Sequence, residues 1–282
     1  MNKILVPTDF SKIAANALNV ALDIAEKFNA EIYLLNIIEP LVDVGFSASG
    51  SVNFENTITE EDRYIYELHR VNEKKLAAFA ARHARGEVDI YPTIGIDKVG
   101  EGILNFAKKY HVDLVIMGTS GENTFEEYFL GNHTEQVMRE SHCPVLAVRN
   151  PIDNFQMENV VLATDLKSNV YESMSYLTRL FSLLNPKIHL LHISKSNNIS
   201  IKETDKQLNE FALKYQLGDH TSNVIHHNNL KAGIQRFAAE MKADLIISFT
   251  HGRKGLAHFL KGSITEDLVK QSKIPVLSVH VD

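Results

Sequence analysis

Cysteine is almost absent from this chain of 282 residues, which contains only Cys143. A single cysteine excludes an internal disulfide and any metal site built from several cysteines. Long apolar runs are also missing, because no stretch approaches the length that crosses a membrane and the apolar run at the N-terminus is too short for a signal peptide. We therefore expect a cytoplasmic protein with no membrane partner.

Positive charge is in deficit, with 29 Lys and Arg against 35 Asp and Glu and a net charge of -6. Broad binding of nucleic acid or of an anionic membrane needs a basic surface excess, so the composition predicts neither partner. The 13 histidines lack a dependable zinc-ligand spacing with cysteine or acidic residues. The chain also lacks a nucleophile-elbow motif. The sequence thus predicts no metal site and no catalytic residues.

The chain does contain an internal repeat. Residues 118–132 return as 249–263, an offset of 131, with two of their three glycines kept. Residues 4–9 return as 160–165, an offset of 156. Two homologous domains are the simplest explanation, and we call residues 1–150 repeat 1 and residues 151–282 repeat 2.

Repeat 1 carries an insertion, because 156 minus 131 leaves 25 extra residues before the glycine loop. They fall at about residues 40–66, a segment rich in Ser, Gly, Asn, Thr and acidic side chains. This composition predicts a loop or flap. Two interpretations remain open: a lid over a ligand crevice, or an excursion with no ligand role.

Short apolar runs alternate with longer segments of helical period. In repeat 1 the expected strands are residues 3–7, 31–37, 88–94, 114–117 and 145–148. Ser11 is placed as the N-cap of the first helix, whose apolar stripe ends at Phe28. This alternation predicts a parallel sheet covered by helices on both faces. Ligands of such sheets bind at the carboxyl ends of the strands, so Asp9 and Gly118 should face one crevice.

The glycine loop of repeat 1 is suited to binding an anion. Gly118 and Gly121 allow the backbone to approach a ligand, and Gly131 is expected to open a helix over residues 132–140. The N-terminus of a helix offers unpaired N–H groups and a partial positive charge to a phosphate. Spaced glycines alone are equally typical of tight turns.

The combination of features is more specific than the glycines. A first-strand Asp, the Leu-Leu-(Asn/His)-Ile of the second strand, the spaced glycines and the Pro-Val-Leu of the last strand together resemble the universal stress protein family, in its tandem form. The resemblance implies two tandem flavodoxin-like (adenine nucleotide alpha hydrolase-like) α/β domains, each with a five-stranded parallel sheet, packed as a pseudo-dimer. It also implies a role in stress responses and, in many members, binding of ATP or another adenine nucleotide.

Carried over by position, the resemblance implies a nucleotide site in repeat 1. The residues implied are Pro7, Asp9, Ile37, Met117, Gly118, Gly121, Gly131, Asn132 and His133. Asn132 stands where the family usually has Ser or Thr, and its amide can still donate to a phosphate. The acidic residues between Gly121 and Gly131 lie close to the expected polyphosphate, so that either Mg²⁺ offsets their charge or they point to solvent.

The implied site of repeat 2 is altered. Its candidate residues are Asp165, Ile193, Gly252, Gly262 and Ser263. Phe249 replaces the first glycine, and a bulky side chain is unsuitable there if the position needs positive φ or a close approach to the sugar. The ring then fills either the adenosine half of the pocket or the core. We therefore expect one adenine nucleotide site, in repeat 1.

Three functions remain open for the chain: a nucleotide-binding regulatory module, which we favour, a ligand-free interaction scaffold and a slow ATP hydrolase. The two repeats are expected to pack through their fifth strands, residues 144–148 and 275–279, because open sheet edges invite pairing. Assembly into a further homodimer is left open.

Overall fold

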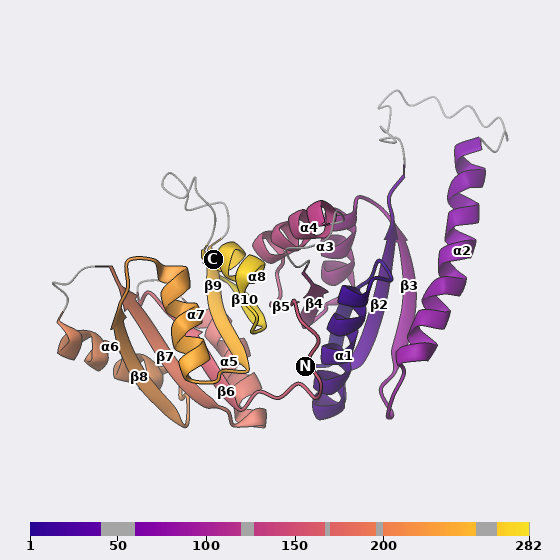
Figure 1. The fold of residues 1–282 in the computed structure, drawn as a ribbon. Helices are drawn as coiled ribbons and strands as arrows, with labels where there is room; N and C mark the ends of the chain where they lie inside the picture. Colours follow the sequence, from indigo (N-terminus) through magenta and orange to yellow (C-terminus); the bar gives the residue numbers. More distant parts are fainter. Residues whose placement is uncertain (41–59, 120–126, 167–169, 196–199, 252–263, 282) are drawn as a thin grey trace.

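The computed structural model describes residues 1–40, 60–119, 127–166, 170–195, 200–251 and 264–281. These form one ten-stranded sheet with helices on both faces (Figure 1). The elements of repeat 1 are β1 (Lys3–Pro7), α1 (Lys12–Phe28), β2 (Glu31–Ile38), α2 (Glu60–His83), β3 (Ile90–Ile96), α3 (Val99–Tyr110), β4 (Leu114–Gly118), α4 (Glu127–Glu140) and β5 (Val145–Val148). Those of repeat 2 are β6 (Asn159–Ala163), α5 (Tyr171–Leu184), β7 (Lys187–Ser194), α6 (Ile201–Lys214), β8 (His220–His226), α7 (Leu230–Glu240), β9 (Leu245–His251), α8 (Ile264–Gln271) and β10 (Val276–Val281).

Each repeat contributes five parallel strands, and the two sets meet at their fifth strands. The order is β3-β2-β1-β4-β5 in repeat 1 and continues as β10-β9-β6-β7-β8 in repeat 2. β5 and β10 pair in the antiparallel sense, with Leu146 opposite Leu277. The predicted parallel sheets and the predicted pairing of the fifth strands are both confirmed.

Apolar side chains fill both faces of the sheet because successive residues of a strand point to opposite sides. In β1, Ile4 and Val6 join the core beneath α1, α2, α5 and α6. Leu5 joins a second core beneath α3, α4, α7 and α8. This burial on two faces explains why the strands read as continuous apolar runs.

Helix α1 begins as its sequence predicts. The Ser11 hydroxyl oxygen accepts a hydrogen bond from the Ala14 N–H at 3.1 Å and caps the helix. The expected apolar stripe is buried, and Phe28 packs partly buried at its end. Asn29 ends the helix at a φ of 50°, the left-handed conformation common after helix C-termini.

The insertion of repeat 1 is partly helical. Residues 60–66, expected as loop, form the first two turns of α2, which has 24 residues against 14 in α6, the corresponding helix of repeat 2. The loop prediction is therefore wrong for these residues, because a polar composition does not prevent a helix from continuing beyond the sheet that it covers. Residues 41–59, and with them the interpretation as a lid, lie outside the described residues.

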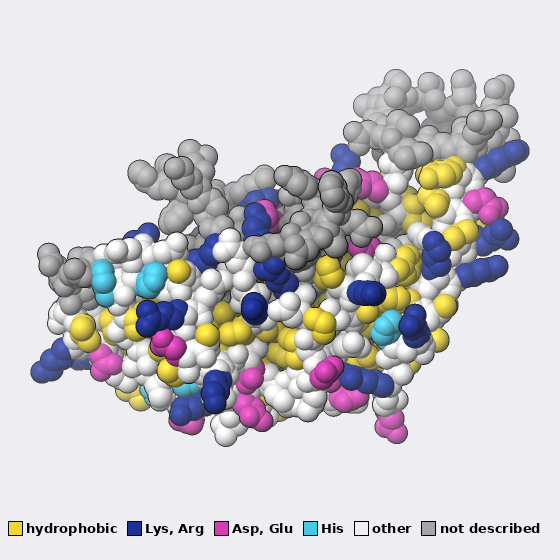
Figure 2. Space-filling model, viewed as in Figure 1, with side chains coloured by type: hydrophobic (Ala, Val, Ile, Leu, Met, Phe, Trp, Pro, Cys, Tyr) yellow, Lys and Arg dark blue, Asp and Glu magenta, His cyan; other side chains and the backbone are white. Residues whose placement is uncertain are grey.

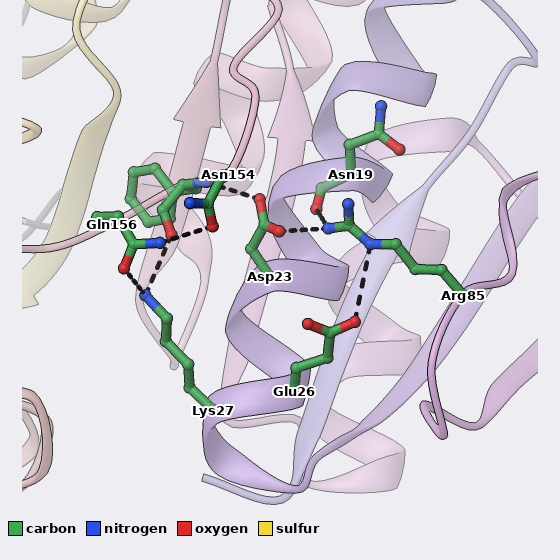
Figure 3. Close-up of polar contacts among 8 residues, drawn as sticks. Asn19, Asp23, Glu26, Lys27, Arg85, Asn154 and Gln156 are labelled. Carbon is green, nitrogen blue, oxygen red and sulfur yellow. Dashed lines mark hydrogen bonds and ion pairs between the residues drawn. The ribbon is translucent and has the colours of Figure 1, made fainter.

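Asp23 of α1 anchors the segment that joins the two repeats (Figure 3). Its Oδ2 accepts the Phe155 N–H at 2.7 Å, and its Oδ1 forms an ion pair with Arg85. One turn further along α1, Lys27 donates to the Phe155 carbonyl at 3.2 Å and to Gln156 Oε1 at 2.6 Å. Phe155 is buried in the core beneath α1 and α5. The linker is thus held to repeat 1 by its backbone as well as by its aromatic side chain.

Cross-repeat contacts also join α4 and α8. Lys270 Nζ of α8 lies 2.5 Å from Glu135 Oε1 of α4. Arg149, just after β5, donates to the Lys270 carbonyl at 2.7 Å. These contacts extend the short β5–β10 ladder to the helices that flank it.

On the face shown in Figure 2, Lys and Arg side chains are interspersed with Asp and Glu. No helix in the described part of the chain is long and apolar enough to cross a membrane.

We predict that Asp23→Ala lowers the free energy of unfolding by about 1–3 kcal/mol, because it leaves the buried Phe155 N–H and Arg85 without their carboxylate. Urea unfolding measures the change. Glu26→Ala is the matched control on the same helix. Glu26 is 47% exposed and lies 3.9 Å from Arg85, so its loss should change stability by no more than about 0.5 kcal/mol. Equal effects of the two substitutions would contradict the anchoring role of Asp23.

His189 of β7 is a buried histidine whose protonation the fold opposes. Its Nδ1 lies 2.9 Å from Thr221 Oγ1, and no described residue partners its Nε2. Burial lowers the pKa of His189, Lys187 lowers it further, and Asp219 acts in the opposite direction.

The lowered pKa of His189 predicts that the protein loses stability below pH 6.5, the ordinary pKa of histidine. The unfolded chain takes up this proton at higher pH than the folded chain, so the free energy of unfolding falls as the pH falls towards the folded pKa. In urea unfolding at about pH 7.5 and about pH 5.5, His189→Leu should show less pH dependence than the wild type. His226→Leu, at an exposed histidine, should keep the wild-type dependence. If the free energy of unfolding depended equally on pH in all three proteins, His189 would not be the source of the pH dependence.

Candidate functional site

The predicted site residues of repeat 1 converge on one edge of the sheet. β1 pairs with both β2 and β4, so the carboxyl ends of these three strands adjoin. Pro7 ends β1, Ile37 lies near the end of β2, and Met117 and Gly118 end β4. The structure brings these residues together with Asp9, as expected for strands that enter a parallel sheet side by side.

The loop between β1 and α1 presents the Asp9 carboxylate to solvent. Asp9 Oδ1 accepts the Ser11 N–H at 3.0 Å, and Thr8 Oγ1 accepts the Phe10 N–H at 3.0 Å. Phe10 has a φ of 67°. These bonds orient an exposed carboxylate, a group that accepts hydrogen bonds from hydroxyls such as those of a ribose.

Repeat 2 builds the same loop. Thr164 Oγ1 accepts the Leu166 N–H at 3.1 Å, and Leu166 has a φ of 62°. Asp165 is exposed like Asp9. The turn is therefore a shared backbone feature and does not distinguish the two repeats.

A polar residue of the second strand supports this loop in each repeat. Asn36 is buried, and its Nδ2 donates to the Thr8 carbonyl at 2.8 Å. Asn72 of α2 donates to Asn36 Oδ1 at 3.1 Å. In repeat 2, His192 Nδ1 lies 3.1 Å from the Thr164 carbonyl and donates to it. His192 thus supports the loop of repeat 2 through Nδ1.

The sequence did not predict the role of Asn72. Its partner Asn36 is 36 residues away, and Asn72 belongs to none of the repeated sequence motifs. The roles of Asn36 and His192 are detectable in the sequence, since each is a polar residue at the same position of a second strand that is mostly apolar around it.

Ile37 is closely covered by two glycines. A Cβ atom at Gly95 would lie 2.6 Å from Ile37 Cδ1, and one at Gly102 would lie 2.9 Å from it. In repeat 2, a Cβ at Gly233 would lie 2.8 Å from Ile193 Cδ1. The side chains of Ile37 and Ile193 therefore pack closely against these glycines of β3, α3 and α7.

Gly118 allows α1 to approach β4. A Cβ atom there would lie 2.6 Å from Ile13 Cγ2, 2.8 Å from the Ile13 carbonyl oxygen and 2.9 Å from its carbonyl carbon. Gly118 is not among the described residues with positive φ. The position does not need positive φ, and the close approach that the structure shows is to the first turn of α1; a close approach to a sugar stays a prediction.

The prediction that Gly131 opens a helix is wrong. α4 begins at Glu127, so Gly131, Asn132 and His133 lie beyond its first turn. The first-turn N–H groups, which lack partners within a helix, therefore belong to residues before Gly131. The error arises because glycine spacing marks flexible positions without showing where the helical hydrogen bonds begin. Gly121 lies outside the described residues, as do Gly252, Gly262 and Ser263.

The model of the universal stress protein family matches this chain twice, over residues 1–149 and 157–280. The chain belongs to the universal stress protein family. Universal stress protein MJ0531 of Methanocaldococcus jannaschii is 33% identical over 149 residues, 53% of this chain and 82% of that protein. Universal stress protein Slr1230 of Synechocystis is 23% identical over 299 residues, 99% of each chain.

A solved structure supports the tandem fold of this universal stress protein. The crystal structure of a universal stress protein from Archaeoglobus fulgidus matches with a TM-score of 0.69 and 19% identity, over 99% of this chain and 98% of that chain. At this identity the likeness concerns the fold alone.

The two repeats of this universal stress protein differ at the first glycine of the loop, where Phe249 replaces Gly118. Phe249 is partly buried, packs against the core beneath α1 and α5, and lies opposite Val279 in the sheet. The ring therefore belongs to the core, one of the two interpretations considered from the sequence.

Among the described residues, no three His, Cys, Asp or Glu side chains are placed to hold a metal ion.

Gly118→Ala should destabilise the protein by about 1–3 kcal/mol, because the added methyl group overlaps the Ile13 backbone. Ile13→Ala in the same chain should not restore stability, since the carbonyl atoms remain in place. Thermal and urea unfolding of the two single variants and the double variant provide the measurement. Restoration of wild-type stability in the double variant would show that only the Ile13 side chain requires the glycine.

Proposed function

We propose that repeat 1 binds one adenine nucleotide and that binding makes this universal stress protein a regulatory module of the stress response. The observation that carries the proposal is the exposed Asp9 carboxylate near Gly118, at the edge of the sheet where the carboxyl ends of β2, β1 and β4 adjoin. Repeat 2 keeps the equivalent aspartate but has Phe249 in place of the glycine. We propose the division into residues 1–150 and 151–282 accordingly, with the repeats packed as a pseudo-dimer.

The proposed nucleotide lies across the ends of β2, β1 and β4. The adenine lies beside the Ile37 backbone, the Asp9 carboxylate accepts hydrogen bonds from ribose hydroxyls, and the phosphates extend towards β4 and α4. Amide N–H groups of the first turn of α4, which starts at Glu127, suit an anion. The remaining proposed contacts are Pro7, Met117, Gly118, Gly121, Gly131, Asn132 and His133.

Repeat 2 serves mainly as a structural or regulatory half in this proposal. The packing of Phe249 against the core favours that role. Hydrolysis of the nucleotide is not part of the proposal, because no activated nucleophile or base has been identified among the described residues. Since adenine nucleotides are cytoplasmic metabolites, the proposal includes a cytoplasmic location.

Isothermal titration calorimetry with ATP, ADP and AMP, with and without Mg²⁺, tests the proposal. We expect one nucleotide per chain. Asp9→Asn keeps an oxygen for the Ser11 N–H and removes the negative charge, so it should weaken binding about tenfold through the loss of charge-assisted hydrogen bonds. Asp165→Asn, the matched change in repeat 2, should bind as the wild type. Two nucleotides per chain, or none, would refute the proposal.

A further inference from the structure

Thr119 is a buried hydroxyl without a partner at the edge of the sheet proposed to bind the nucleotide. Its N–H donates to the Val148 carbonyl at 2.9 Å, continuing the pairing of β4 with β5. The residue is 4% exposed, and no hydrogen-bond partner for its Oγ1 is found in the described part of the chain. A buried hydroxyl without a partner is costly and uncommon, so its presence needs an explanation.

The same position of repeat 2 is satisfied internally. Thr250 corresponds to Thr119, and its Oγ1 lies 3.2 Å from Ser278 Oγ and 3.5 Å from the Val279 carbonyl. Ser278 corresponds to Ala147 of repeat 1. The fifth strand of repeat 1 therefore lacks the hydroxyl that lies nearest to the threonine of repeat 2.

The orientation of Thr119 follows from the strand. A Cβ at Gly118 would point at Ile13 of α1, and successive side chains alternate between faces. Thr119 therefore lies on the other face, together with Met117, which packs in the core beneath α3 and α4. The proposed nucleotide has its adenine at β2 and its ribose at β1, so its phosphate half is the part that reaches β4.

We infer that the Thr119 hydroxyl binds the nucleotide of repeat 1, donating a hydrogen bond to an oxygen of its sugar–phosphate half. This inference rests on the proposed function. In repeat 2 the pair Thr250–Ser278 uses the corresponding hydroxyl within the protein, alongside the replacement of the first glycine by Phe249. The difference between Ala147 and Ser278 therefore contributes to the restriction of binding to repeat 1.

A binding role and a purely structural role for Thr119 predict different results. A hydroxyl kept for a ligand costs stability while the ligand is absent, so Thr119→Val should leave the Tm of the nucleotide-free protein unchanged or raise it. The same substitution should weaken nucleotide binding. A structural hydroxyl would instead lower the Tm when removed.

The experiment is calorimetric titration of the full chain with ATP, with the Tm of each nucleotide-free protein measured in parallel. We expect Thr119→Val to bind about tenfold more weakly, the loss of about one hydrogen bond. Thr119→Ser keeps the hydroxyl and should bind within about twofold of the wild type. Ala147→Ser offers Thr119 the partner that Thr250 has and should give an intermediate affinity.

Wild-type affinity in Thr119→Val would overturn the inference while leaving the proposed site intact. A lowered Tm in the nucleotide-free Thr119→Val protein, with weakened binding, would also overturn it by assigning the hydroxyl to the fold. Failure of the wild type to bind any nucleotide would refute the proposed function and this inference with it. Weaker binding in Thr119→Val with no fall in Tm, and near-wild-type binding in Thr119→Ser, would support both.

Discussion

The antiparallel pairing of β5 with β10 is the interaction on which the arrangement of the whole molecule depends. It joins two parallel sheets into one and satisfies backbone groups that would otherwise be exposed at two edges. The paired segment is short, so further contacts hold the halves together. Lys270 reaches Glu135 on one face, and Asp23 holds the linker through the Phe155 N–H on the other. Side-chain contacts on both faces of the sheet therefore support the interface between β5 and β10.

Within this common frame, the two repeats use equivalent positions differently. Asn36 and His192 both donate to the carbonyl of the threonine before the exposed aspartate, so a change of side chain preserves the loop. At the first glycine of the loop, the change of side chain does alter the packing. Phe249 packs against the core in repeat 2, whereas Gly118 leaves space for the first turn of α1 in repeat 1. A conserved architecture can thus carry one proposed ligand site and one altered copy.

The predictability of each feature depends on how local its cause is. The bounds of β1 and β5 match the predicted residues, and Ser11 caps α1, because apolar runs and N-cap chemistry act over a few residues. The strand β3 lies two residues later than predicted, at Ile90–Ile96. The start of α4 and the helical residues 60–66 were missed, since helix ends are determined by packing as well as by composition.

The sequence alone determined the number of repeats, the order of their elements and the asymmetry at Gly118 and Phe249, because periodicity and substitution are visible without coordinates. The tertiary structure alone decided what the asymmetry means physically. The backbone of Ile13 requires the glycine, the absence of a hydroxyl at Ala147 leaves Thr119 unpaired, and Asp23 reaches a linker more than a hundred residues away. Such contacts join residues distant in the chain, so no local pattern records them.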